Sequence, residues 1–534
     1  MKGISPRYDD AFVLAHLVPR PAWRFTDFSG DLSGRYIGAL AAASQSGGHD
    51  FPHLDQVVTE ALRLQTAGGH FSAPISEGKG VNSDMALLWG NGRMLTGLLE
   101  YYQLTKRADV LAAARKLGDF FVHVGQRFNR EEVRKEYSSG QAAHGYICWT
   151  SGLEGIAGLY RLTHEDRHLA LARDIAAATE RCPGGHSHGF LTTLRGILAL
   201  YRATGDNRYL KQVEREWKGV IERGTLLIQR AVPELFAPKI KRDEGCSEAE
   251  WLRLSLELWQ ITHQPEYPAQ AENTLFNEFF FNQFHSGDFG HPRLTGDGIG
   301  PEFARAWWCC PFHGLRAMAP LFGHAFHREQ DALFYDLPID GDGGDGEFRV
   351  TAESGLERNQ SVRLSIAKAD GKAHRLGVRV PPWASDVSLS IDGRPETAGL
   401  HADRLSIVRN WKPGEVVTAR YRLRSHLSRD EKRPGRVAIF HGPWLLAVDQ
   451  ELSPHYFDEP SDRNKAQWAI SAAGIRLDAV KDAAPGSPFA VPCAHLKFPY
   501  VPGGYPTQPA TCVLPPMAEF TAGPDSNRLE FWLP

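Results

Sequence analysis

The stretch LALYRATGDNRYLKQVEREW, residues 198–217, indicates two helices joined by a tight turn. Apolar residues before Tyr201 recur at helical spacing. In the polar turn Thr204-Gly205-Asp206, the glycine is typical of a helix end and the aspartate of a helix start. A second helical pattern follows directly. The stretch therefore predicts a pair of helices, and such a pair needs neighbours to cover its apolar faces.

The same arrangement occurs three more times in the first half of the chain. In each copy a threonine follows an aromatic residue by three positions, and a polar turn and a second helical stretch come next. The aromatic residues are Tyr102, Tyr160, Tyr201 and Trp259, and the threonines are Thr105, Thr163, Thr204 and Thr262. Repeated helix pairs must stack on one another. We expect a closed toroid of paired helices, with an open helical scaffold as the alternative.

Three segments rich in glycine, histidine and tryptophan favour the closed form. They are LLWGNGR (87–93), HGYICWTSG (144–152) and GGHSHG (184–189), and we interpret them as loops that precede inner helices. In a toroid such loops converge on one mouth, so the sequence predicts a pocket there.

The pattern changes near residue 330. Apolar and polar residues then alternate over four to eight positions, as in SVRLSIAKAD (361–370) and VVTARYRL (416–423), and turn sequences such as GDGGDG (341–346) separate the segments. This predicts an antiparallel β-sandwich. We therefore divide the chain into a helical catalytic domain at 21–328 and a β-sandwich region at 329–534. Residues 1–20 form an N-terminal segment that we expect to add a strand to the sandwich.

Composition narrows the range of partners. A formal net charge of −3 over 534 residues offers no surface for nucleic acid or anionic lipid. No apolar run approaches the roughly 18 residues that span a bilayer. The start, MKGISPRYDDAFVLAHLVPRP, lacks the apolar core of a secretory signal, and the 7 cysteines are too sparse for a disulfide framework. We expect a cytoplasmic protein with no nucleic-acid or membrane partner.

The segment WWCCPFHG, residues 307–314, contains two adjacent cysteines. Together with Glu244-Gly245-Cys246, earlier in the chain, they supply three thiols and a carboxylate, a plausible tetrahedral set for Zn²⁺. Adjacent ligands need a sharp backbone bend, which Pro311 suits. A metal-bound thiolate can also act as a nucleophile. Buried cysteines that only fill a core, or a purely structural zinc ion, are the alternatives.

These motifs resemble those of glycoside hydrolase family 127, the β-L-arabinofuranosidase family. The family pattern G-E-x-F is similar to residues 233–236 (PELF), E-T-C to residues 244–246, Y-E-R-x-L-Y-N to residues 271–277 (AENTLFN), and C-C-P-P-N to residues 309–313 (CCPFH). Several strand segments, such as VRVPPWA and VAIFHGPWLLAVD, also follow the family. The resemblance implies an (α/α)6 barrel followed by β-sandwich domains.

The resemblance also implies residue roles. Cys309 would attack the anomeric carbon, and Glu234 would be the general acid and then the general base of a retaining double displacement. Glu272 would hydrogen-bond sugar hydroxyls. The implied zinc ligands are Glu244, Cys246, Cys309 and Cys310.

The pocket departs from the family pattern. Arg93 stands where the family has a pocket histidine, Trp149 lies near the place of a second one, and His186 or His188 offers a remaining one. We expect all four residues to bind substrate. An arginine at the mouth suits an acidic sugar. Arabinofuranose is therefore the family default, and the sugar stays open.

The leading prediction is a zinc-dependent retaining glycoside hydrolase that acts on small-molecule or oligosaccharide glycosides and can form a homodimer. A carboxylate-only glycosidase, lyase or epimerase with a structural zinc ion is the first alternative. A non-catalytic carbohydrate-binding scaffold is the second.

Overall fold

The computed structural model describes most of the helical region and the first β-sandwich, and only short strands near the C-terminus. The described residues are 9–19, 28–47, 50–75, 81–137, 145–179, 185–223, 225–236, 242–284, 287–294, 298–300, 308–329, 332–430, 437–449, 468–469, 489–495, 510–514 and 529–530. Most of the chain after residue 449 therefore lies outside the described residues. Among the described residues, the helices are all too short or too polar to cross a membrane.

The contacts among six helices form a closed inner ring. Each helix packs on the next, and the last packs on the first. In order they are α2 (Asp31–Gly47), α4 (Val81–Thr105), α8 (Leu153–Thr163), α10 (Ser187–Thr204), α12 (Gly245–Thr262) and α14 (Cys310–Leu321). The closed (α/α)6 toroid is thus confirmed.

An outer helix follows each of the first five inner helices and packs on it. These outer helices are α3 (Pro52–Arg63), α5 (Ala108–Phe128), α9 (Asp166–Ala178), α11 (Asn207–Glu222) and α13 (Glu266–Thr274). After α14 the chain passes instead through a short 3-10 turn, η4 (Phe322–His324), into the β-region. The shorter helices are α1 (Asp10–Ala15), α6 (Glu131–Tyr137), α7 (Ile147–Thr150), α15 (Leu356–Asn359) and the π-helical turn η2 (Leu275–Phe279).

The repeated aromatic–threonine sequence marks the C-terminal ends of four inner helices. The threonine is the last helical residue, and its Oγ1 donates a hydrogen bond of 2.8–3.0 Å to the carbonyl four residues earlier. The next residue has a left-handed backbone and donates its N–H to the carbonyl of the aromatic residue. These endings are Thr105-Lys106, Thr163-His164, Thr204-Gly205 and Thr262-His263. α2 and α14 end without the motif, so the sequence repeat covers only four of the six inner helices.

The segment LLWGNGR lies inside α4, so its interpretation as a loop is wrong. Glycine weakens an isolated helix by about 1 kcal/mol, but α2 crosses α4 too closely for side chains. A Cβ atom on Gly34 would overlap the backbone of Arg93, and one on Gly97 would overlap the backbone of Gly34. Gly90 meets the backbone of Ser29 in the same way. The other two segments do lead into inner helices: GGHSHG enters α10, and the described part of HGYICWTSG forms α7 before α8.

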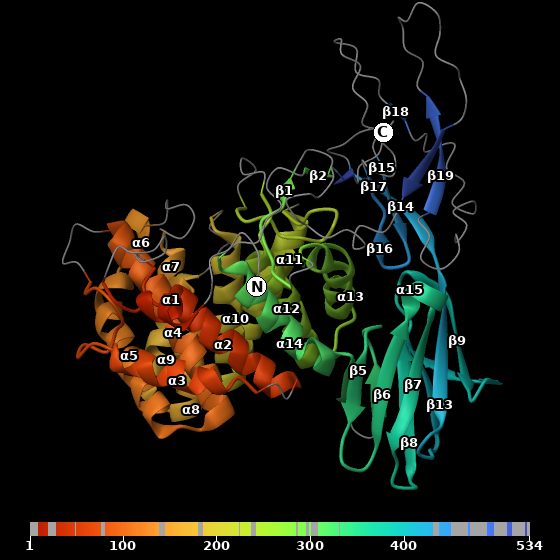
Figure 1. The fold of residues 1–534 in the computed structure, drawn as a ribbon, viewed down its shortest axis with the longest axis horizontal. Coiled ribbons are helices and arrows are strands. Elements are labelled where there is room, and N and C mark those ends of the chain that lie inside the picture. The colour runs from red at the N-terminus through yellow and green to blue at the C-terminus, as the bar shows by residue number, and fades with distance from the viewer. Residues whose placement is uncertain are drawn as a thin grey trace, which may run out of the picture.

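The β-sandwich beside the barrel consists of two sheets (Figure 1). The six-stranded sheet has the order β10-β9-β13-β7-β6-β5, and the five-stranded sheet has the order β11-β12-β8-β4-β3. Their bounds are β3 Phe326–Glu329, β4 Ala332–Tyr335, β5 Gly341–Gly344, β6 Arg349–Gly355, β7 Ser361–Lys368, β8 Ala373–Arg379, β9 Ala384–Ile391, β10 Arg394–Glu396, β11 Gly399–His401, β12 Arg404–Asn410 and β13 Val416–Leu423. Phe348 stacks on His374 across the two sheets, with ring centroids 4.6 Å apart.

Two details of the sandwich differ from the prediction. β4 pairs with β8 in parallel, whereas the sequence predicted antiparallel pairing throughout. Most of the GDGGDG segment is the edge strand β5 rather than a turn, because its backbone pairs with β6. An edge strand forms backbone hydrogen bonds with a neighbouring strand on one side only. A glycine-rich segment can form these bonds without side-chain packing.

Further short strands join the barrel to the C-terminal region. The sheet β1-β2-β21-β17 combines β1 (Arg293–Leu294) and β2 (Gly298–Gly300), which lie between helices, with β17 (Val448–Asp449) and β21 (Leu529–Glu530). The remaining strands are β14 (Ser425–Arg429), β15 (Val437–His441), β16 (Trp444–Leu445), β18 (Trp468–Ala469), β19 (Phe489–His495) and β20 (Ala510–Leu514).

The described part of the N-terminal segment is helical and adds no strand to the sandwich. Asp9 caps α1 by accepting a hydrogen bond of 2.8 Å from the backbone N–H of Phe12. The Phe12 ring stacks on Trp308, just before α14, with centroids 5.6 Å apart. The segment therefore packs against the barrel.

We expect Gly97→Ala to lower the free energy of unfolding by about 1–3 kcal/mol, because the added methyl group forces α2 and α4 apart. Alanine has the higher helix propensity, so a net loss reports the close crossing alone. Denaturant unfolding followed by circular dichroism measures the change. Gly346→Ala is the control, since a Cβ atom there meets nothing within 4 Å. Equal stability of the two variants would contradict the close crossing.

Candidate active site

The N-terminal ends of three inner helices meet at one place. His186, Glu244 and Cys309 are the N-cap residues of α10, α12 and α14. His186 Nε2 lies 3.5 Å from Glu244 Oε2, and the Sγ atoms of Cys246 and Cys310 are 3.6 Å apart. Helix N-termini carry partial positive charge, which favours carboxylates and thiolates. The barrel geometry thus gathers acidic and thiol groups at these helix starts.

Four ligand atoms converge in this place. One atom each from Glu244, His291, Cys309 and Cys310 lies within 4.8 Å of the others, and all four residues are buried. With Cys246 they form what we call the thiol cluster. Thiol, imidazole and carboxylate donors together suit a transition-metal ion, so the thiol cluster can bind a metal. Three of the four predicted zinc ligands, Glu244, Cys309 and Cys310, belong to this group, and the fourth, Cys246, lies beside it with its Sγ atom 3.6 Å from Cys310 Sγ.

His291 was not among the predicted ligands. Two backbone hydrogen bonds of 2.9 and 3.0 Å join residues 290–292 to residues 243–245. They bring His291 Nε2 to 3.9 Å from Glu244 Oε1. The only sequence signal is a Gly-His-Pro triplet in a loop, and no spacing rule connects it with the distant Glu244.

The three thiols differ in their readiness to ionise. Hydrogen bonds from Cys246 and Cys310 lower the pKa of Cys309 well below its usual value. Burial raises the pKa of Cys246 and that of Cys310 well above the usual value. Cys309 is also 8% exposed, whereas the other two are fully buried. Cys309 therefore has the properties of a reactive thiolate.

Arg35, on α2, places a buried positive charge against the thiol cluster. Its Nη1 lies 3.7 Å from Cys246 Sγ, and its Nε donates a hydrogen bond of 2.7 Å to Asp31 Oδ1. Asp31 Oδ1 also accepts a hydrogen bond of 3.0 Å from Trp89 Nε1. The guanidinium is thus held in one position and offsets part of the negative charge of thiolates. The sequence analysis missed Arg35, because an arginine within a helix carries no motif.

Glu234 borders the thiol cluster and is paired with an arginine. Its backbone carbonyl accepts a hydrogen bond of 3.0 Å from Ser187 N at the start of α10. Its carboxylate accepts hydrogen bonds from Arg242 Nε and, at 2.5 Å, from Arg242 Nη2. Negative charges on Glu234 and Cys309 both act on Glu244 and on His186. The predicted acid/base and the predicted nucleophile therefore lie at the same site.

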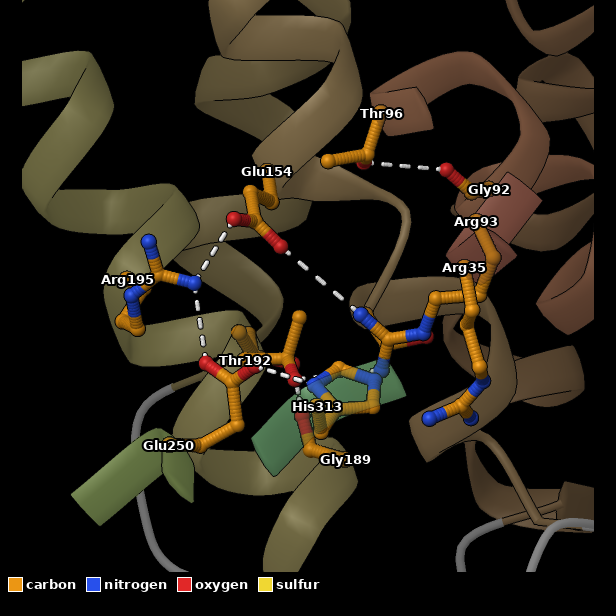
Figure 2. Close-up of polar contacts among 12 residues, drawn as sticks. Arg35, Gly92, Arg93, Thr96, Glu154, Gly189, Thr192, Arg195, Glu250 and His313 are labelled. Carbon is orange, nitrogen blue, oxygen red and sulfur yellow. Dashed lines mark hydrogen bonds and ion pairs between the residues drawn. The ribbon is translucent and has the colours of Figure 1, made fainter. Parts of the chain in front are cut away.

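Arg93 lies inside the barrel rather than at its mouth (Figure 2). Its Nη2 donates hydrogen bonds to His188 Nε2 at 3.2 Å and Thr192 Oγ1 at 3.1 Å. Its Nη1 is 3.7 Å from Glu154 Oε2. Burial and the neighbouring Arg35 lower the pKa of Arg93 to about 10. Its Nε and Nη1 atoms have no hydrogen-bond partner among the described residues, so part of the guanidinium stays available to a ligand inside the barrel.

Two histidines lie beside Arg93. The rings of His188 and His313 meet edge to face with centroids 4.4 Å apart, and His313 Nδ1 is 2.8 Å from Glu250 Oε1. Burial lowers the pKa of both imidazoles well below the usual value. Burial also lowers the pKa of His186 to about 4. These histidines are therefore neutral near pH 7. His188 Nε2 accepts from Arg93 and His186 Nδ1 accepts a hydrogen bond of 3.3 Å from Gly189 N, so the other nitrogen of each ring carries a proton and can donate to a ligand.

Trp149 is a core residue. Its ring packs against Phe121 and Phe128, its Nε1 donates a hydrogen bond of 2.8 Å to Asn129 Oδ1, and it is fully buried. Trp149 thus lies on α7 with its ring packed against α5 and not at the thiol cluster.

Glu272 lies where the barrel meets the sandwich. Its carboxylate accepts hydrogen bonds from Arg379 Nη2 and Trp383 Nε1, and only 1% of the residue is exposed. Both oxygen atoms thus face the sandwich, which leaves neither for the sugar hydroxyls that the sequence analysis assigned to Glu272.

A network of buried ion pairs fills the barrel near Arg93 (Figure 2). Arg195 is paired with Glu154 at 2.7 Å, with Glu250 at 2.8 Å and with Glu257 at 2.7 Å. Glu257 also contacts Arg202 at 2.9 Å. These side chains come from α8, α10 and α12, so the network ties three inner helices together.

Glu257→Gln tests this network through pH. Burial raises the pKa of Glu257, but Arg195 and Arg202 more than offset this and lower it to about 2. A folded-state pKa below the unfolded value of 4.5 stabilises the protein above pH 4.5, and this stabilisation disappears as the pH falls towards 2. We expect the variant to lose about 3 kcal/mol at pH 7 and much less near pH 3, in urea unfolding at both pH values. The control Glu222→Gln, at an exposed residue, should change stability little. If Glu257→Gln lost the same stability at both pH values, the lowered pKa of Glu257 would be contradicted.

Solved structures share this fold over almost the whole chain. A GH127 β-L-arabinofuranosidase from Geobacillus stearothermophilus T6 superposes with a TM-score of 0.70 at 17% identity, over 99% of this chain and 94% of that one. A second GH127 β-arabinofuranosidase gives 0.71 at 18% identity, over 99% and 91%. The architecture is that of an (α/α)6-barrel glycoside hydrolase with β-domains.

Family models match both described domains. The model of the β-L-arabinofuranosidase GH127 catalytic domain matches residues 10–321, which run from α1 to the end of α14. The GH127 middle-domain model matches residues 333–423, which cover the sandwich from β4 to β13. A search of curated proteins found no match. The chain belongs to the GH127 β-L-arabinofuranosidase family and is a glycoside hydrolase.

Proposed function

We propose that this enzyme hydrolyses glycosides with retention of configuration, with Cys309 as nucleophile and Glu234 as general acid and base. The observation that supports this most is the inequality of the three thiols. Cys309 is the thiol whose pKa is lowered and the one with an exposed surface, whereas Cys246 and Cys310 are buried around it. A thiolate, not a thiol, is the nucleophile.

We further propose that the thiol cluster holds zinc. Glu244, Cys246, Cys309 and Cys310 offer three sulfur atoms and one oxygen atom, a donor set that zinc prefers. When bound, zinc keeps coordinating thiols deprotonated and stabilises negative charge on sulfur. Three thiolates and a carboxylate outweigh the charge of one zinc ion, and Arg35 supplies a compensating cation. His291 is positioned to hydrogen-bond the cluster or to replace one ligand.

The reaction then takes two steps. Cys309 Sγ attacks the anomeric carbon while the bond to the leaving oxygen breaks, and Glu234 gives that oxygen its proton. Glu234 next takes a proton from water, the resulting hydroxyl attacks the anomeric carbon, and the carbon–sulfur bond breaks to restore the Cys309 thiolate. Arg242 binds both oxygen atoms of the Glu234 carboxylate, so it must move aside before Glu234 can protonate a leaving group.

We propose a β-L-arabinofuranoside as the substrate, because the family is named for this activity. The argument for an acidic sugar assumed that Arg93 lies at the mouth, whereas Arg93 is buried inside the barrel, which weakens that argument. Neutral His186 and His188 suit hydroxyl groups, whose oxygen atoms accept hydrogen bonds from imidazole N–H groups. A carboxylate-only mechanism remains the competing proposal, in which the thiols only bind metal.

Cys309→Ser separates these two mechanisms. We expect kcat to fall by more than about 10³-fold on an aryl β-L-arabinofuranoside, because a serine hydroxyl is not ionised there. Metal content is measured on the same samples, and chelation followed by zinc addition should abolish and restore wild-type activity. Cys148→Ala, a buried cysteine outside the thiol cluster, is the control. Full activity of Cys309→Ser would overturn the thiolate mechanism.

Glu234→Gln tests the acid/base role. We expect kcat/KM to fall by about 10²–10⁴-fold for an alkyl glycoside, which needs a protonated leaving group, and far less for a nitrophenyl glycoside. The measurement is kcat/KM of the variant and the wild type on both substrates. Glu222→Gln, on the surface of α11, should leave both values unchanged. Equal losses for the two substrates would assign Glu234 to binding instead.

A further inference from the structure

Three more carboxylates lie buried beside the start of α12. Asp243, Glu248 and Glu278 each place an oxygen atom within 4.8 Å of the others, and all three residues are 0% exposed. Acidic side chains are almost never fully buried unless they are paired. Across the described part of the chain, no basic side chain forms an ion pair with any of the three.

Their outer oxygen atoms are held by donors. Asp243 Oδ1 accepts a hydrogen bond of 2.8 Å from Glu244 N, and Glu248 Oε1 accepts one of 2.9 Å from Asn282 Nδ2. Asn282 is itself fixed, since its Oδ1 accepts a hydrogen bond of 2.7 Å from Gly290 N. Such second-shell bonds orient the ligands of metal sites.

The inner oxygen atoms have no such partner. Asp243 Oδ2, Glu248 Oε2 and both carboxylate oxygens of Glu278 are buried without a hydrogen-bond partner. Glu278 comes from the separate π-helical turn η2 and points at the other two carboxylates. A buried side chain with both oxygen atoms unpartnered is costly unless a ligand satisfies them.

Protons or a cation could relieve this arrangement. Burial and the neighbouring Asp243 raise the pKa of Glu278 well above its usual value, which shows how unfavourable three bare charges would be. Ca²⁺ binds carboxylate oxygens at about 2.3–2.6 Å, so oxygens spaced by up to 4.8 Å can surround one ion. The converging unpartnered oxygens and the fixed outer ones favour the cation.

We propose that Asp243, Glu248 and Glu278 bind a divalent cation of the Ca²⁺ class, at a site separate from the thiol cluster. The donors here are all oxygen, whereas the thiol cluster is rich in sulfur, so the two sites select different metals. Asp243 directly precedes Glu244, and Glu248 N donates a hydrogen bond of 3.2 Å to Glu244 O. The cation therefore fixes the start of α12, which carries Glu244 and Cys246.

Titration of the zinc-loaded full chain with Ca²⁺, after removal of other cations, tests the site. Calorimetry should show one Ca²⁺ per chain, and saturating Ca²⁺ should raise Tm by about 2 °C or more. Glu278→Gln keeps the side-chain shape but removes one charge, and we expect it to weaken Ca²⁺ binding at least about 10-fold. Exposed Glu222→Gln should bind as the wild type does. Cys309→Ser should keep Ca²⁺ binding even where it loses zinc.

The opposite results overturn the proposal. If the wild type binds neither Ca²⁺, Mg²⁺ nor Mn²⁺ at millimolar concentration, the three carboxyl groups share protons instead of a cation. Unchanged Ca²⁺ binding in Glu278→Gln would place the ion elsewhere. If Glu278→Gln fails to fold, Asp243→Asn replaces it as the test variant. Loss of Ca²⁺ binding in Asp243→Asn would then support the site, and unchanged binding would overturn it.

Discussion

The contact between α14 and α2 closes the inner ring, and the active site depends on this closure. It brings Arg35 on α2 against Cys246 on α12, whose Sγ atom lies 3.6 Å from Cys310 Sγ at the start of α14. An open stack of the same helix pairs would keep the thiols together, because α12 and α14 are consecutive, but it would leave them without this cation. The lowered pKa of Cys309 depends first on hydrogen bonds from Cys246 and Cys310, and Arg35 lowers it further.

Local chemistry predicted much of this molecule. The threonine endings, the turn at Thr204-Gly205-Asp206 and the alternating strands depend on hydrogen bonds between near neighbours, which a sequence displays directly. The same approach misread the glycines of α4, because the reason for Gly97 is the backbone of Gly34 on another helix. The cysteine–glutamate set was found because thiols are rare and their metal chemistry is specific.

Other residues could not be placed without the fold. His291 reaches Glu244 through backbone pairing of two distant loops, and Arg242 donates hydrogen bonds to Glu234, eight positions earlier, with no motif linking the two. A motif likewise preserves a residue type without showing what surrounds it. Glu272 fits the family pattern, yet its partner is Arg379, 107 residues away in the sandwich. Arg93 and Trp149 were also assigned from position in a pattern, and their burial became visible only when the helices were assembled.

In the described part of the chain, five inner helices are each followed by an outer helix, and the chain leaves the sixth, α14, directly for the sandwich. η4 packs against β5, and Arg379 of β8 holds Glu272 of α13 in a buried ion pair. Removing the sandwich would uncover η4 and leave the buried carboxylate of Glu272 without its cation. The catalytic barrel is therefore not a portable module. Its gene can be shortened or recombined only together with the segment that encodes the sandwich.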